Sequence, residues 1–117
     1  MAYLLLVVEP VEQRGQRTEE EGREVYDQMV RFAGDLNARG ILRAVESLSS
    51  LKDAARVTAS NGDARVVDGP FAEAKEMIGG FFLIDCETRE QAVEIAAQCP
   101  AAKWCTIEVR KVGPCYS

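Results

Sequence analysis

The sequence predicts an α+β sandwich in which an antiparallel sheet carries two helices on one face. Short apolar or alternating runs are typical of strands, and two amphipathic segments with capping signals are typical of helices. Their order along the chain is strand, helix, strands, strand, helix, strand. Because no Pro/Gly/Ser-rich linker divides the 117 residues, we expect residues 1–117 to form a single domain.

The first two predicted elements are an apolar strand and a capped helix. The run Tyr3–Val8 is apolar throughout and stops before Pro10, which favours a buried strand. Thr18 and Glu21 have the spacing of a capping box, so a helix is expected to begin at this point. Gly40 is suited to the C-terminal cap of that helix.

Apolar residues recur at steps of three and four along this helix and predict its buried face. They are Val25, Tyr26, Met29, Val30, Ala33 and Leu36. Phe32 lies off this stripe and is expected to cover an edge or an interface.

The middle of the chain predicts further strands. Residues 41–48 suit a short strand, and residues 54–60 and 64–68 flank Asn61-Gly62. Asn-Gly supplies the positive φ angles of a type I′ turn, so a hairpin is expected here. Residues 80–85 are aromatic and aliphatic and predict another strand.

The last elements are a second helix and a final strand. Thr88 and Gln91 form another capping box, and Pro100 limits the helix that follows. Trp104–Val109 alternates in the manner of a strand. This order matches a ferredoxin-like fold, whose second sheet face has no helical cover. If that face is apolar, a second subunit must cover it, so we expect a homodimer formed through the sheet face.

Composition excludes several classes of function. The 14 Lys and Arg against 19 Asp and Glu give a net charge of −5 without a basic stripe, which argues against nucleic-acid binding. The absence of histidine excludes His-based acid–base and nucleophilic catalysis and His-ligated metal. The apolar start is far shorter than the ~20 residues of a membrane span and lacks signal-peptide features. We therefore expect a cytoplasmic protein without membrane contact.

The four cysteines are expected to be small buried hydrophobes in a reducing compartment. They are Cys86, Cys99, Cys105 and Cys115. None forms a C-x-x-C pair, so no zinc site and no other metal site is expected. Cys115 is the one expected to be exposed, and its reactivity depends on surroundings that the sequence does not define.

The stretch from Val66 to Asp85 contains the most distinctive local pattern. Asp68-Gly69-Pro70-Phe71 suits a tight turn with an aromatic anchor. Gly79-Gly80 suits a bulge or a close backbone approach, and neither glycine belongs to a phosphate-binding loop. No cofactor is expected.

The charged residues of this stretch have two interpretations. One is a solvated surface loop. The other is that Asp68, Glu73, Lys75 and Glu76 converge at the mouth of a pocket and bind a ligand. Asp68 or Glu76 would then be the catalytic base, with Lys75 stabilising charge. The spacing matches no calcium-binding loop.

These residues closely resemble the DGPF-containing branch of the YCII-related proteins. The matching residues are 67–76 and 79–84, with weaker likeness in the opening strand, residues 92–97 and 100–102, and the closing strand. The resemblance implies a ferredoxin-like subunit that dimerises through its sheets, in the dimeric α/β-barrel group. A His–Asp pair proposed for YCII-type active sites cannot be carried over, because this chain has no histidine.

Three functions follow from the residues and the resemblance. The first is a small cytoplasmic dimer that binds a small molecule or partner in a cleft near the DGPF turn. The second is a lyase- or isomerase-like enzyme that uses carboxylates of the DGPF segment, since some relatives look like small lyases or dehydrochlorinases. The third is an accessory regulator of a bacterial extracytoplasmic-function sigma factor, because genes of this branch often lie beside genes for such factors.

Overall fold

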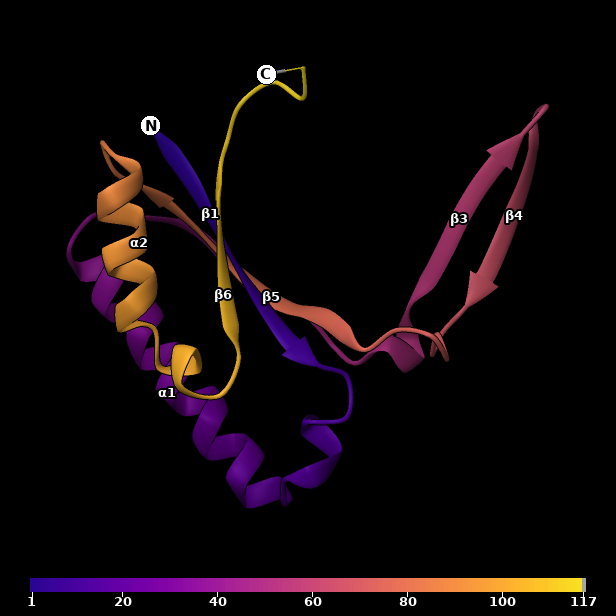
Figure 1. Ribbon diagram of the computed structural model, residues 1–117. Coiled ribbons are helices and arrows are strands. Elements are labelled where there is room, and N and C mark those ends of the chain that lie inside the picture. Colours follow the sequence, from indigo (N-terminus) through magenta and orange to yellow (C-terminus); the bar gives the residue numbers. More distant parts are fainter. Residues whose placement is uncertain (117) are drawn as a thin grey trace.

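The computed structural model describes residues 1–116 and contains an antiparallel sheet with two helices on one face (Figure 1). The strands, in the order of the sheet, are β2 (Leu42–Ser47), β5 (Glu76–Asp85), β1 (Ala2–Pro10) and β6 (Thr106–Lys111). The helices are α1 (Glu19–Ala38) and α2 (Arg89–Gln98). The predicted α+β, ferredoxin-like fold is therefore confirmed.

Short 3-10 turns and a separate hairpin complete the described chain. The turns are η1 (Arg14–Gln16), η2 (Leu51–Asp53) and η3 (Pro100–Lys103), and the hairpin strands are β3 (Ala55–Ser60) and β4 (Asp63–Asp68). Asn61 and Gly62 have φ angles of 51° and 83°, as a type I′ turn requires. The predicted hairpin is thus confirmed, but it lies outside the four-stranded sheet.

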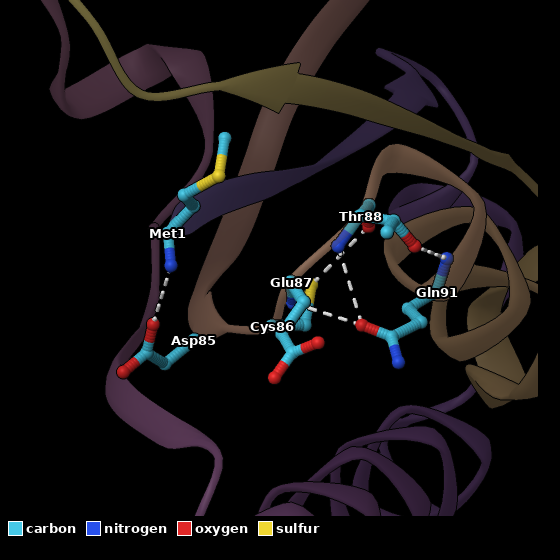
Figure 2. A network of polar contacts seen from close by, with 6 residues as sticks. All are labelled: Met1, Asp85, Cys86, Glu87, Thr88 and Gln91. Carbon is cyan, nitrogen blue, oxygen red and sulfur yellow. Dashed lines mark hydrogen bonds and ion pairs between the residues drawn. The ribbon is translucent and has the colours of Figure 1, made fainter.

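Both predicted capping boxes begin their helices. Figure 2 shows the second one, in which the Thr88 hydroxyl accepts from the Gln91 backbone N–H at 3.1 Å. The Gln91 side chain accepts in return from the Thr88 N–H at 3.2 Å. Nearby, the N-terminal ammonium of Met1 pairs with Asp85 at 3.2 Å and ties the start of β1 to the end of β5. Among residues 1–116, no helix has both the length and the apolar character needed to cross a membrane.

The core lies between the helices and one face of the sheet. Burial alternates along β1, so that Tyr3, Leu5 and Val7 point into this core. Phe32 of α1 meets Phe82 of β5 edge to face, with the ring centroids 5.3 Å apart. The core therefore depends on aromatic packing between α1 and the middle of the sheet.

The prediction of which α1 side chains are buried was wrong in part. Phe32 is buried in the core, whereas Tyr26 and Val30 are 56% and 51% exposed. Leu36 is buried as predicted, and Met29 packs against the core. The face of α1 that packs on the core is therefore rotated toward Phe32. Where α1 crosses the sheet decides which of its side chains point into the core. The shift leaves two large apolar side chains of α1 outside the core.

The sheet face without helices is also apolar at its centre. Register places Leu4 opposite Leu83 and Leu6 opposite Phe81, and side chains of such pairs share a face. These four residues are half-buried. We call them, with Val8, the open sheet face.

β5 begins four residues before its predicted start. Glu76 already pairs with Pro10, and the Val11 N–H donates to the carbonyl of Lys75 at 3.0 Å. The last residues of the distinctive motif are therefore strand rather than loop. β6 begins and ends two residues later than the predicted strand Trp104–Val109.

Candidate functional site

The four predicted site residues lie along an exposed segment that joins the hairpin to β5. Asp68 ends β4, and Glu73 lies in the following turn. Lys75 directly precedes β5, and Glu76 is its first residue. Glu73 pairs with Arg56 of the hairpin at 3.2 Å. Their joint role in binding or catalysis stays a prediction.

A depression of about 360 Å³ lies beside this segment. Its lining residues are Val8, Leu51, Arg56, Phe71, Glu76, Met77 and Ile78. Of the predicted residues Glu76 contributes to this lining, whereas Asp68, Glu73 and Lys75 do not.

The DGPF tetrapeptide fixes the base of the hairpin. Phe71 is buried, and the Arg56 guanidinium lies 3.8 Å from its ring centroid. The Gly69 N–H donates to the Ala54 carbonyl at 2.8 Å, and a Cβ at Gly69 would lie 1.9 Å from the Leu51 carbonyl oxygen. Only glycine fits such a close backbone approach. The turn and the buried Phe71 ring therefore fix the position of the hairpin relative to the four-stranded sheet.

A larger cleft lies elsewhere, between α1 and the sheet, and has a volume of about 760 Å³. We call it the α1 cleft. Apolar side chains from α1 and the sheet line one part of it: Tyr26, Met29, Val30, Ala33, Val45 and Phe82. Charged side chains line another part: Glu9, Arg14, Arg17, Glu19, Arg23 and Asp27. Sites for small organic molecules combine apolar walls with polar groups that orient the ligand.

An ion pair between a buried carboxylate and a partly exposed guanidinium lies in this cleft. The Glu9 side chain is 8% exposed and accepts a hydrogen bond from Arg14 Nε at 2.5 Å. Arg14 also donates to the backbone carbonyls of Leu48 at 2.8 Å and Gly79 at 3.3 Å. Because all three guanidinium nitrogens are engaged, Arg14 ties η1 to β1, β5 and the end of β2.

Two glycines of the motif allow close approaches, Gly79 to this ion pair and Gly80 to the backbone of β2. The register skips Gly79, since Val7 pairs with Gly80 and Val8 pairs with Ile78, so Gly79 is a bulge residue. A Cβ at Gly79 would lie 2.7 Å from Glu9 Cδ, and one at Gly80 would lie 2.8 Å from the Glu46 carbonyl oxygen. The predicted bulge and close approach are both confirmed.

Trp104 and Arg17 form another wall of the α1 cleft. The Arg17 guanidinium lies 5.9 Å from the Trp104 ring centroid, and its side chain is half-buried. Gln13 donates from Nε2 to the Trp104 carbonyl at 2.7 Å, which holds the backbone at the entry to β6. Arg17 forms no ion pair with any of the residues that the structure describes.

The thiols near the core are held in their protonated form. Burial raises the pKa of Cys105 to about 11, and the nearby charge of Glu9 acts in the same direction. Burial also raises the pKa of Cys99 and of Cys86. Cys99 is fully buried as predicted, Cys86 and Cys105 are half-buried, and Cys115 is exposed as predicted. The Cys105 thiol is therefore a poor nucleophile at neutral pH.

Glu9 and Arg14 were not among the predicted site residues, although one signal was present. Glu9 continues the inward alternation of Tyr3, Leu5 and Val7, so a strand reaching Pro10 places its carboxylate on the core side. No local pattern in the polar loop identifies Arg14 as its partner.

A family model of the YCII-related domain matches residues 1–115. The chain belongs to the YCII-related family. The DGPF-containing branch of that family stays a resemblance based on residues 67–76 and 79–84. A similar protein is "Uncharacterized protein R00369" from Rhizobium meliloti (strain 1021), which is 44% identical over 57 residues. The alignment covers 49% of this chain and 46% of that protein, so it spans about half of each.

Proposed function

We propose that this YCII-related protein binds a small organic anion with an apolar, aromatic body in the α1 cleft. The observation that carries the proposal is the juxtaposition, in a cleft of about 760 Å³, of exposed apolar side chains with an Arg17 guanidinium that forms no ion pair within residues 1–116. The cleft volume lies within the ~300–1,000 Å³ range of ligand pockets.

The apolar wall supports the nature of the ligand's body. Tyr26 and Val30 lie on α1 outside the core and are 56% and 51% exposed. Across the cleft lies Val45 of the sheet, which is 38% exposed. A flat apolar group between these walls would remove their surface from water, which is favourable at ~25 cal/mol per Å².

The charges support the nature of the ligand's head. Arg14 is saturated by Glu9 and two carbonyls, and Arg23 pairs with Glu19 at 2.7 Å. Arg17 therefore has the most free hydrogen-bonding capacity among the three arginines of the cleft. A guanidinium binds a carboxylate in a two-point geometry. Glu9, already held by Arg14, adds a fixed negative charge that disfavours a second anionic group beside it.

A matched ligand panel tests this proposal. Aryl carboxylates, such as phenylacetate and substituted benzoates, would be compared with their neutral amides by thermal shift and then by calorimetry. We expect binding by carboxylates and not by amides, and a loss of about 10-fold or more in Arg17→Ala, since hydrogen bonds to charged groups contribute about 1.5–3 kcal/mol. Arg31→Ala removes an exposed α1 arginine outside the cleft and should leave affinity unchanged. Equal losses in both variants would contradict the proposal.

We also propose that two copies associate through the open sheet face. Its centre presents Leu4, Leu6, Phe81 and Leu83 without a helix over them, and contiguous apolar surface of this kind marks an association site. Sedimentation equilibrium of Leu6→Asp tests the dimer. Dissociation is expected, and a wild-type monomer at 100 micromolar would contradict it.

The remaining predictions concern chemistry, a partner and location. Catalysis by Asp68, Lys75 and Glu76 requires a substrate in the depression that Glu76 lines, and predicts that Glu76→Gln loses turnover of a compound that binds there. Association with a sigma factor predicts co-purification with the factor whose gene is adjacent. A failure to co-purify would contradict a regulatory role of this kind. A cytoplasmic location is part of the same proposal.

A further inference from the structure

The hairpin formed by β3 and β4 stands apart from the body of the molecule. We call it the arm (Ala55–Asp68). Every residue of both strands is exposed, and the chain has a radius of gyration of 16.1 Å. A compact domain of this length has a radius of about 13 Å. The arm therefore extends the molecule beyond what its own core can cover.

One face of the arm is apolar. Val57 pairs with Val66, and these two side chains are 63% and 58% exposed. Alternation places Ala55, Ala59 and Ala64 on the same face, with Asp68 at its base. The opposite face carries Arg56, Thr58, Ser60, Asp63, Arg65 and Val67.

The arm is held in place at its base. Arg56 lies over the ring of buried Phe71 and pairs with Glu73, and the Gly69 N–H bonds to the Ala54 carbonyl. In Figure 1 the arm stands on the side of the sheet opposite both helices. Another protein molecule that packs on the open sheet face therefore lies beside the arm.

We propose that the apolar face of the arm packs against a second copy of this chain that is seated on the open sheet face. An isolated two-stranded hairpin is at best marginally stable in water. Contact with the partner gives the arm the apolar support that its own subunit does not supply. The DGPF turn then has a role that goes beyond identification of the family, since it aims the arm at the partner.

The available area favours an occupant that touches both surfaces. Two strands of about 20 Å, spaced ~4.8 Å apart, give the arm face only ~200 Å². Four strands of similar length give the whole uncovered face of the sheet ~400 Å² by the same spacing, and the open sheet face on β1 and β5 is its apolar centre. Their sum reaches the ~600 Å² per partner at the lower end of stable interfaces, whereas the arm alone does not. A two-fold dimer buries both surfaces on both copies with one type of contact.

This inference rests on the proposed dimer, so the experiment separates the two. Sedimentation equilibrium would compare wild type with Val57→Asp, Thr58→Asp and Leu6→Asp. Thr58 is the matched control because it neighbours Val57 on the polar face of the same strand. We expect the dimer dissociation constant to rise at least 10-fold in Val57→Asp and to stay within about twofold in Thr58→Asp, as expected for a carboxylate placed in an apolar contact or in solvent.

Each outcome decides one proposal. A monomeric wild type would overturn both the dimer and the arm contact. Dissociation of Leu6→Asp with no change in Val57→Asp would overturn the arm contact alone. Hydrogen exchange of wild-type arm amides gives a second measurement that needs no variant. Protection that disappears on dilution to monomer supports the contact, and rapid exchange within the dimer overturns it.

Discussion

Gly79→Ala is the substitution whose effect the structure defines most closely. The added Cβ would lie 2.7 Å from Glu9 Cδ, 2.8 Å from Glu9 Oε1 and 2.8 Å from Arg14 Nη2. Ordinary contacts begin near 3.4 Å, so the carboxyl group must move by about 0.7 Å. The movement occurs at a side chain that is only 8% exposed and is held by Arg14.

Two effects set the magnitude. Overpacking a well-filled site costs about 1–3 kcal/mol. Weakening a charge-assisted hydrogen bond costs a further part of its ~1.5–3 kcal/mol. Since relaxation relieves some of each, we expect the free energy of unfolding to fall by about 2–4 kcal/mol.

Urea denaturation followed by Trp104 fluorescence and far-UV circular dichroism measures this change. Protein concentration is held fixed, because association would shift the apparent stability. Gly34→Ala is the control. Gly34 is exposed within α1, has no atom near the position of an added Cβ, and should gain up to about 1 kcal/mol from the higher helix propensity of alanine.

A double-mutant cycle tests the cause. In a Glu9→Ala background the carboxyl group is absent, so Gly79→Ala should cost at least about 1 kcal/mol less than in wild type. The same cost in both backgrounds would refute the explanation, because the clash would then not involve Glu9.

The remaining predictions concern the ion pair, a helix cap and a thiol. Arg14→Ala leaves the Glu9 carboxylate buried without its partner and should cost about 3–5 kcal/mol in urea denaturation, and a loss below about 1 kcal/mol would contradict a buried pair. Thr88→Ala removes the hydroxyl that accepts from Gln91 N–H and should cost about 1 kcal/mol in thermal unfolding. The folded-state pKa of Cys105 is raised to about 11. The contribution of this thiol to the free energy of unfolding is therefore complete below the unfolded thiol pKa of about 8.5, and it is lost as pH rises through about 11. Cys105→Ala should therefore flatten stability against pH across that window, and an unchanged alkaline slope would contradict the raised pKa.

Local signals predicted the elements that depend on neighbouring residues. The capping boxes at Thr18 and Thr88 and the Asn61-Gly62 turn are each complete within four residues, and all three formed as expected. The Gly79-Gly80 bulge was predicted for the same reason. Such features need no knowledge of the rest of the chain.

Contacts between distant segments were not predictable in this way. The rotation of α1 toward Phe32 depends on where the helix crosses Phe82, which is 50 positions away in the chain. The engagement of Arg14 with Leu48 and Gly79 joins three segments. The charged residues of the motif were therefore the predicted site, whereas the larger of the two clefts lies around Glu9.

The central claim is that the α1 cleft binds a small aromatic anion, and Trp104 can report it directly. It is the single tryptophan of the sequence and lines the cleft beneath Arg17. Titration of the wild-type protein with phenylacetate and related aryl carboxylates should change Trp104 fluorescence in a saturable way. Arg31→Ala should keep that change, and Arg17→Ala should shift its midpoint about 10-fold or more. A panel that leaves Trp104 fluorescence unchanged, or that binds Arg17→Ala as tightly as wild type, would contradict the claim.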